Sequence, residues 1–109
     1  MRQMTKAEGV IGLARRAGQI AVGTNGTLDA IRSGKAKLVL IASDVSENTR
    51  KLLTDKALFR NVPTEFPPLN TEALGKCVGK FNTAAVAFLQ DGFVIAYHGA
   101  LSVNQEGEL

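Results

Sequence analysis

Cysteine, histidine and tryptophan are scarce or absent in this chain of 109 residues. Its single cysteine, Cys77, cannot form an intrachain disulfide, which fits a reducing intracellular compartment. Its single histidine, His98, cannot build the ligand sets of common zinc sites or a histidine-based catalytic triad. We therefore expect no metal site and no enzyme of the kinds that depend on these residues.

Long apolar runs and nucleotide-binding motifs are missing too. Apolar runs such as Leu38–Ala42 are far too short to cross a bilayer, and Glu8 and Gly9 interrupt the segment after the basic start of the chain. Neither a G-x-x-x-x-G-K-[ST] nor a G-x-G-x-x-G pattern is present. We expect a soluble, cytoplasmic and non-enzymatic protein with no cofactor, no small-molecule substrate and no membrane partner.

Apolar residues and positive charge are what the chain does have. Hydrophobic residues make up 45% of it, which predicts a folded core rather than disorder. Its 13 basic and 10 acidic residues leave a net charge of +3, and a basic body suits a polyanionic partner. We expect a monomer with one domain over residues 1–100 and a polar, flexible tail over residues 101–109.

The apolar pattern alternates strands with helices. Two runs without alternation, Leu38–Ala42 and Ala84–Leu89, predict central strands that are covered on both faces. Residues 93–97 fit either a last helix or a strand, and the chain from His98 onward has the pattern of a loose end. The other predicted elements are strands at 19–22 and 64–66 and helices at 6–17, 24–33, 47–60 and 71–77. This order predicts an α/β fold, a three-layer α/β/α sandwich with a mixed sheet of about four strands.

Polar residues at the helix starts indicate where three of these helices begin. Thr5 can cap the first helix, Ser46 the third, and Asn70 or Thr71 the fourth. The inward-facing residues expected in the third helix are Leu52, Leu53, Ala57 and Phe59.

The main binding candidate is the segment Gly23–Asp44. A polar turn opens its helix, where Thr24 or Asn25 is expected to cap the first N–H groups. The positive end of the helix then lies beside a glycine-rich backbone, a geometry that can receive a phosphate or a base edge. An ordinary capped helix in an α/β unit has the same pattern. Right-handed crossovers place this helix start with the loops at 43–48 and 78–83 on one edge of the sheet.

Basic residues and one aromatic ring supply further candidates. Lysines and arginines near the end of that helix and around a later glycine turn can contact phosphates without reading base sequence. Phe81, in a Lys-Phe-Asn turn, can either pack on a flipped base or fold back as a loop anchor. The predicted RNA-binding residues are Gly23, Thr24, Asn25, Gly26, Arg32, Lys35, Lys37, Lys76, Lys80, Phe81 and Asn82.

Four motifs in order across residues 9–90 resemble the ribosomal protein L7Ae/L30e superfamily. They are Gly-Thr-Asn at 23–25, Gly-Lys-Ala-Lys-Leu-Val-Leu-Ile-Ala-Ser-Asp at 34–44, Val-Pro at 62–63, and Leu-Gly-x-x-x-Gly at 74–79. The segment Gly-Leu-Ala-Arg-Arg-Ala-Gly at 12–18 is similar to the short bacterial members of the YlxQ type. The resemblance implies an α/β/α sandwich that binds structured RNA, often the kink-turn, a bent helix with tandem sheared G·A pairs. It also implies no cofactor and no enzymatic activity.

The resemblance further implies which residues contact RNA, and this chain departs from the pattern. The family's G-x-N-E motif places its Asn and Glu at the bases of the G·A pairs. Gly23 and Asn25 match that motif, but Gly26 stands in place of the Glu, and Asp29 stands where the family has a Lys. The recognition loop, apolar in the family, is Lys-Phe-Asn-Thr at 80–83. These departures predict weak binding to a standard kink-turn.

Two classes of function are open at this point. The first is an RNA-binding protein that is ribosome-associated or binds another structured RNA, as part of a ribonucleoprotein, through the loops at one sheet edge. The second is a protein-interaction module on the same fold, in which Gly26 and Asp29 record a lost RNA site. An enzyme is disfavoured because no nucleophile–base pair is evident, and Asp44, in an Asp-Val-Ser-Glu context, fits a turn into the next helix better than a catalytic acid.

Overall fold

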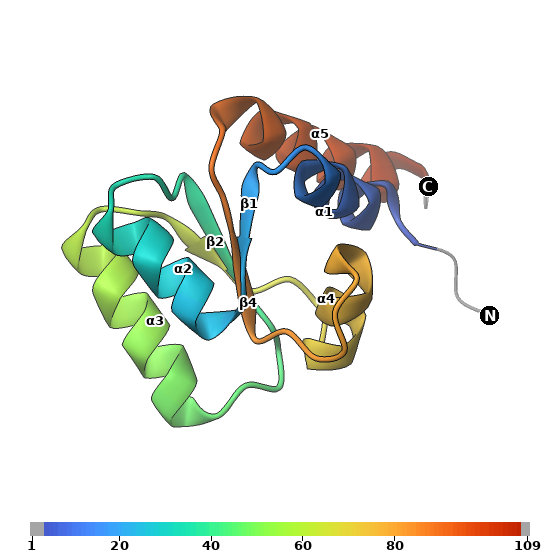
Figure 1. Cartoon of the computed structure of the whole chain (residues 1–109). Helices are drawn as coiled ribbons and strands as arrows, with labels where there is room; N and C mark the ends of the chain where they lie inside the picture. Colours follow the sequence, from blue (N-terminus) through green and yellow to red (C-terminus); the bar gives the residue numbers. More distant parts are fainter. Residues whose placement is uncertain (1–3, 108–109) are drawn as a thin grey trace.

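The computed structural model describes the backbone of residues 4–107 and the side chains of residues 4–102. Within this range helices cover both faces of a four-stranded sheet (Figure 1). The elements along the chain are α1 (Lys6–Arg16), β1 (Ile20–Val22), α2 (Gly23–Arg32), β2 (Leu38–Ile41), α3 (Glu47–Phe59), β3 (Thr64–Glu65), α4 (Thr71–Val78), β4 (Ala85–Phe88) and α5 (Asp91–Gly107).

The sheet is mixed, as predicted, with the strand order β1-β4-β2-β3. Strand β4 is antiparallel to both β1 and β2, whereas β2 and β3 are parallel. All residues of β2 and β4 are buried, which explains why their sequences are apolar without alternation. The two-residue strand β3 lies at an edge, next to the prolines that follow it.

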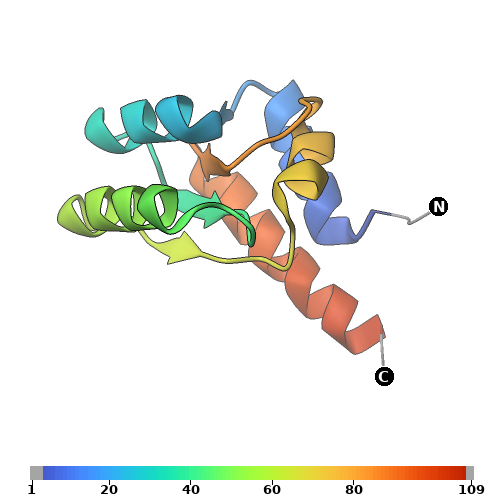
Figure 2. The ribbon, with the colours of Figure 1, turned by 90° about the horizontal axis from the view of Figure 1, so that it is seen from below.

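Two separate apolar clusters hold the layers together. On one face, Ile31 of α2 and Leu53 of α3 are fully buried against Val39 of β2. On the other face, α1, α4 and α5 pack on the sheet around Ile11, Leu74 and Tyr97. Figure 2 shows α2 and α3 on one side of the sheet and α1 and α4 on the other. The three-layer α/β/α sandwich is therefore confirmed.

Side-chain caps begin three of the helices where the sequence predicts them. Thr5, Ser46 and Asn70 each accept a hydrogen bond from the backbone N–H three residues later. The predicted cap of α2 is wrong: its N-cap is Val22, which makes no side-chain cap, and Thr24 and Asn25 lie inside the first turn. The reason is that Gly23, with φ of +86°, turns the chain from β1 directly into α2.

The last helix is longer than predicted. Helix α5 runs from Asp91 to Gly107, so the loose end expected from His98 onward is wrong. Tyr97 and Ala100 are buried, and the partly buried Val94 and Leu101 pack beside them on the face that meets α1. Of the predicted tail, residues 101–107 continue α5, while residues 108–109 lie outside the described residues. No helix within the described range is long and apolar enough to span a membrane.

Helix α3 buries a narrower face than predicted. Leu53 and Ala57 are fully buried, one turn apart. Leu52 and Phe59 are instead 41% and 80% exposed, so their predicted packing is wrong. A helix buries a single stripe at its i, i+4 spacing, and residues beside that stripe face outward.

Candidate nucleic-acid interface

The register of the sheet brings three loops to one edge. Val22, the end of β1, pairs with Val86, and Ile41, the end of β2, pairs with Ala85. The start of α2, the β2–α3 loop and the α4–β4 loop therefore leave the sheet at the same edge, at the bottom of Figure 1. We call this the loop edge (the start of α2 at 23–27, the β2–α3 loop at 42–46 and the α4–β4 loop at 79–84). The gathering predicted from right-handed crossovers is confirmed.

The first turn of α2 is open at this edge. No side chain caps it, and Asn25 is exposed. A Cβ atom built on Gly26 would meet only the Cβ of Ala21, at 4.0 Å, so a longer side chain has room there. Uncapped N–H groups and the positive end of the helix dipole give this turn the properties of an anion site.

The α4–β4 loop lies tightly on α4. A Cβ atom built on Gly75 would be 2.6 Å from the carbonyl oxygen of Phe81 and 2.8 Å from that of Lys80. Only glycine permits this approach, so the loop backbone at Lys80 and Phe81 is held close to α4. Phe81 is 88% exposed, which rules out its predicted alternative as an anchor folded back on the core. Lys76 and Asn82 are exposed as well.

Asp44 ties the loop edge to the start of α4. Its carboxylate accepts hydrogen bonds from the Thr71 backbone N–H at 2.7 Å and from the Thr71 hydroxyl at 3.2 Å. The backbone N–H of Ser43 also donates to the Leu69 carbonyl at 2.8 Å. These bonds join the β2–α3 loop to the start of α4. Asp44 thus does more than form the turn expected from its sequence context.

Two buried threonine hydroxyls adjoin the same edge. Thr27, in α2, is fully buried, and Thr83, at the end of the α4–β4 loop, is 2% exposed. Neither hydroxyl oxygen has a hydrogen-bond partner among the described residues. Most buried polar groups in proteins are partnered, so two unpartnered hydroxyls near one edge are unusual.

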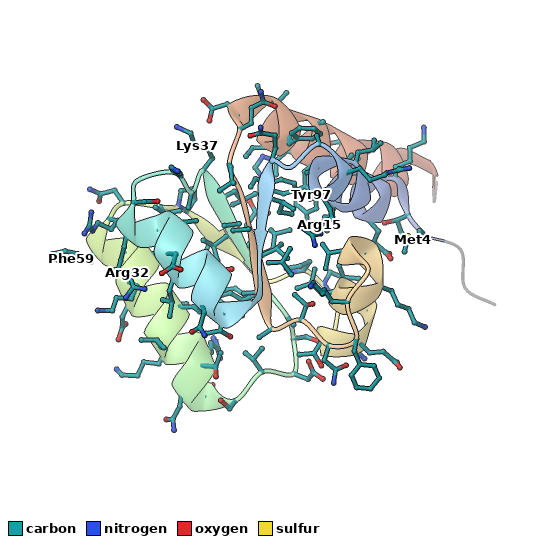
Figure 3. All side chains as sticks on the ribbon, in the orientation of Figure 1. Met4, Arg15, Arg32, Lys37, Phe59 and Tyr97 are labelled. Atoms are coloured by element: carbon teal, nitrogen blue, oxygen red, sulfur yellow. The ribbon has the colours of Figure 1, made fainter. Side chains whose placement is uncertain are left out.

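Three of the predicted site residues lie at the other end of the molecule. The backbone N–H of Lys37 donates to the carbonyl of Phe88, at the end of β4 that is farthest from Ala85. Arg32 is the last residue of α2, and at 1.5 Å per residue this helix is roughly 15 Å long. Figure 3 shows Arg32 and Lys37 on the side of the molecule away from α4. Arg32, Lys35 and Lys37 therefore do not share one face with Gly23–Gly26, and their predicted contact with RNA stays a prediction.

Asp29 has a partner on its own helix. Its carboxylate forms an ion pair with the Arg32 guanidinium at 2.6 Å, and both side chains are largely exposed. Such an exposed pair contributes little to stability. The pair gives Asp29, the one acidic residue of α2, a partner in the Arg32 guanidinium one turn later.

One arginine outside the prediction reaches α4. Arg15 extends from α1 toward α4 in Figure 3, and its Nε donates to the Val78 carbonyl at 3.4 Å. It lines a groove of about 330 Å³ between α1 and α4, together with Arg16 and Gly79. The paired arginines at the end of the first predicted helix were the available signal, but basic residues are common at helix ends.

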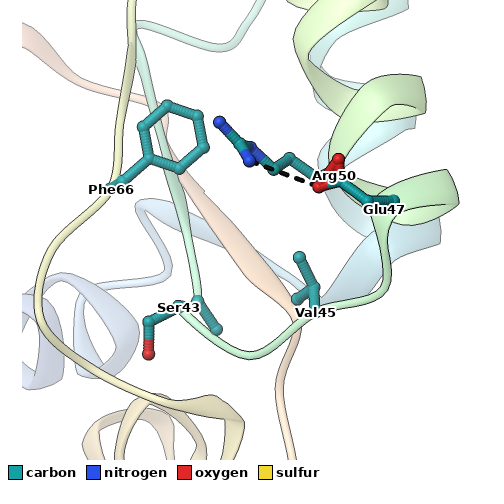
Figure 4. A pocket seen from close by; sticks show the side chains of 6 residues that line it. Ser43, Val45, Glu47, Arg50 and Phe66 are labelled. Atoms are coloured by element: carbon teal, nitrogen blue, oxygen red, sulfur yellow. Dashed lines mark hydrogen bonds and ion pairs between the residues drawn. The ribbon is translucent and has the colours of Figure 1, made fainter.

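A second hollow lies between the β2–α3 loop and the segment after β3 (Figure 4). It measures about 260 Å³ and is lined by Ser43, Val45, Glu47, Arg50 and Phe66. The Arg50 guanidinium lies 5.1 Å from the centre of the Phe66 ring and donates to Glu47 Oε1 at 3.2 Å. Arg50, the only cation among the described residues that line this hollow, is thus already engaged by Phe66 and Glu47.

Groups suited to catalysis or metal binding do not gather in the described part of the chain. Cys77 is buried, and His98 Nε2 lies 2.6 Å from Glu65 Oε2, which links α5 to the edge strand β3. No cluster of three or more His, Cys, Asp or Glu side chains that could hold a metal occurs among residues 4–102. What the loop edge offers is a helix start, an amide, lysines and an exposed ring.

Comparisons with known proteins agree with this arrangement. Residues 5–95 match the model of the ribosomal protein L7Ae/L30e/S12e/Gadd45 family. The RNA-binding protein YlxQ of Bacillus subtilis is 38% identical over 85 residues, which cover 77% of this chain and 83% of that protein. The RNA-binding protein YlxQ of Enterococcus faecium is 41% identical over 75 residues, or 69% and 72% of the two chains. A solved structure of a Bacillus halodurans protein superposes with a TM-score of 0.82 at 27% identity, covering 91% of this chain and 99% of that one.

Proposed function

Because this chain belongs to the ribosomal protein L7Ae/L30e/S12e/Gadd45 family, we propose that it is a non-enzymatic RNA-binding protein whose binding face is the loop edge. The observation that carries this proposal is the uncapped start of α2 on the same edge of the sheet as the loop that carries the exposed ring of Phe81. The two YlxQ relatives are named as RNA-binding proteins, which agrees with it.

Each group at the loop edge has a distinct task in this proposal. The N–H groups in the first turn of α2 receive a phosphate or a base edge. The amide of Asn25 donates to and accepts from a purine edge. Lys76 and Lys80 contact phosphates, and Phe81 stacks on an unpaired base. The tie between Asp44 and Thr71 and the close approach at Gly75 hold these groups in place before RNA arrives.

We infer that the target is a structured RNA, with ribosomal RNA as the first candidate, and that the protein acts as a cytoplasmic monomer. A standard kink-turn should bind weakly. Gly26 leaves open space where the family has a Glu, and the Asp29 carboxylate brings negative charge to α2. The exposed Phe81 and Lys80 support recognition of an unpaired base in some other structured RNA.

Ultraviolet cross-linking in cells, followed by sequencing of the RNA and mass spectrometry of the cross-linked peptides, tests this proposal. We expect cross-links in peptides that contain residues 76–83 or 23–26. A salt series on the recovered complex should show weaker retention as salt rises, because phosphate contacts release counterions. Cross-links confined to other surfaces, or no RNA at all, would favour the protein-interaction module.

A further inference from the structure

The end of the molecule opposite the loop edge carries a second cluster of cations. The C-terminal ends of α2 and α3, which pack against each other, lie there together with the loop into β2. We call this cluster the opposite-end surface. Its members are Arg32, Lys35, Lys37, Lys56, Phe59 and Arg60.

An exposed aromatic ring lies among these cations. Phe59 is 80% exposed, and the Arg60 guanidinium lies 5.9 Å from the centre of its ring. Phe59 and Arg60 line a shallow hollow of about 120 Å³ with Ile31, Arg32 and Lys56. The hollow shows that side chains from α2 and α3 form one continuous surface.

Helix dipoles account for only part of this arrangement. Cations are favoured at the C-terminal ends of helices, which explains Arg32 and Lys56 in the last turns of α2 and α3. The dipole does not explain an almost fully exposed phenylalanine. Nor do most of these cations have ion-pair partners: of the arginines and lysines of the opposite-end surface, only Arg32 is paired with a carboxylate of the described residues, that of Asp29.

We propose that the opposite-end surface is a second RNA contact, which takes a single-stranded segment. Its arginines and lysines bind phosphates, and Phe59 stacks on an unpaired base. Stacking on an aromatic ring accepts every base, and arginine guanidinium planes stack on bases as well. This inference rests on the proposed RNA-binding function and extends it from one surface to two.

The shape of the surface favours RNA over a protein partner. A hollow of about 120 Å³ is well below the roughly 300–1,000 Å³ of pockets that enclose a ligand. It presents an open ring among cations, which suits a flat base on a polyanionic strand. Because α2 is roughly 15 Å long, the RNA must run past this helix to reach both surfaces.

Two RNA probes separate the two surfaces. One is a compact hairpin taken from the RNA recovered by cross-linking, and the other is the same hairpin with an oligouridine extension at either end. The extension should strengthen binding by the wild-type protein. Phe59→Ala should weaken binding of the extended RNA by about fivefold to 150-fold, the range expected for one stacked base, and leave binding of the compact hairpin unchanged.

Matched variants exclude general effects. Leu58→Ala removes an exposed apolar side chain next to Phe59, and Lys51→Ala removes an exposed cation from the same helix. Both should bind the extended RNA as the wild type does. Thermal melts should show that Phe59→Ala folds normally, because its side chain is almost fully exposed.

The possible results divide as follows. Loss of Phe59-dependent affinity with the extended RNA alone supports the second contact. If Phe59→Ala changes the affinity for neither RNA, the second contact is overturned, and a protein partner becomes the better explanation of the opposite-end surface. An equal loss of affinity for both RNAs also overturns it. The loop edge is tested separately by Phe81→Ala on the compact hairpin, so that either surface can fail while the other stands.

Discussion

Gly26 leaves space beside α2 that a longer side chain can fill. The nearest side-chain atom to a Cβ atom built there is 4.0 Å away, in Ala21. We predict that Gly26→Glu combined with Asp29→Lys strengthens binding of a folded kink-turn RNA by at least about 1–2 kcal/mol, the scale of one or two charge-assisted hydrogen bonds. Titration of that RNA at one fixed salt concentration measures the gain.

A control separates recognition from helix stability. Gly26→Ala should stabilise α2 by about 0.5–1 kcal/mol, because glycine is a poor helix former, without improving RNA binding. Breaking the exposed pair between Asp29 and Arg32 should change stability little. Tight binding by the wild type would show that the Lys80–Thr83 loop compensates for both departures, and no gain in the double variant would point to another RNA surface.

Asn25 tests base recognition by a single amide. We predict that Asn25→Ala loses about 1–3 kcal/mol of binding free energy for a preferred RNA and much less for a random one. Gln90→Ala is a matched control, because it removes an amide beyond the other end of β4. Equal losses for both RNAs would mean that Asn25 reads no base. The structure already excludes the alternative role as the helix cap.

Tyr97 makes stability depend on pH in the alkaline range. Burial raises the pKa of Tyr97 from 10.0 to about 12, with smaller electrostatic contributions from Glu65, Cys77 and Glu8. The folded state therefore holds this proton more tightly than the unfolded state does. The contribution of Tyr97 to the free energy of unfolding is fully present below pH 10 and is lost as pH rises toward about 12.

The chain's only tyrosine makes this effect measurable. Tyrosinate absorbance should appear well above the usual pH in the folded protein, and urea denaturation should show a falling free energy of unfolding over the same range. Tyr97→Phe should remove this component of the pH dependence. A normal tyrosinate titration in folded protein would contradict the prediction.

Helix α4 determines where the recognition loop lies. Gly75→Ala places a methyl group against the carbonyl oxygens of Lys80 and Phe81, at 2.8 and 2.6 Å. We predict a loss of about 1–3 kcal/mol in the free energy of unfolding, as for other overpacked sites, with weaker RNA binding because the loop must move. Urea denaturation and RNA titration check the two effects.

The sign of the stability change is what makes this test specific. Gly99→Ala, in α5, meets nothing within 4 Å and should be stabilising by up to about 1 kcal/mol. Both changes replace a helical glycine by alanine, so intrinsic propensity predicts the same sign for both. A stabilised Gly75→Ala variant would show that the loop does not depend on this close approach.

Elements with strong local signals were predictable, and those fixed by tertiary contacts were not. The runs at β2 and β4 are apolar because both faces are covered, and Thr5, Ser46 and Asn70 cap helices as expected. Helix α5 was underestimated because Tyr97 and Ala100 are buried by α1, a contact that sequence spacing alone does not reveal. The predicted side-chain cap of α2 is wrong because Gly23, with its positive φ, turns the chain directly from β1 into α2.

At the scale of the whole molecule, α2 separates two basic regions that its sequence places together. Lys35 and Lys37 are close to Asn25 along the chain, yet the helix carries them to the far end of the sheet. Linear proximity suggested one site, because sequence shows charge but not the direction in which a helix runs. Loop-edge members such as Phe81, distant in sequence from Asn25, are brought to its edge by the register of β1 and β2 with β4.

Salt dependence should report this separation. Removing one lysine or arginine that binds a phosphate lowers the slope of log K against log salt by about 0.7–0.9. We predict that Lys76→Ala with Lys80→Ala lowers the slope for a compact structured RNA, whereas the triple change of Arg32, Lys35 and Lys37 to Ala does not. With a single-stranded extension on the same RNA, the triple variant should also lower the slope, because the extension reaches the far end of α2.

Lys51→Ala provides the matched control, since it removes an exposed cation that is paired with Asp55 and lies outside both regions. Its slope should equal that of the wild type with either RNA. A triple variant that lowers the slope equally with and without the extension would mean that a compact RNA already spans α2. In that case the loop edge and the opposite-end surface would contact the same compact RNA. They would then act as one binding face despite their separation along the sheet.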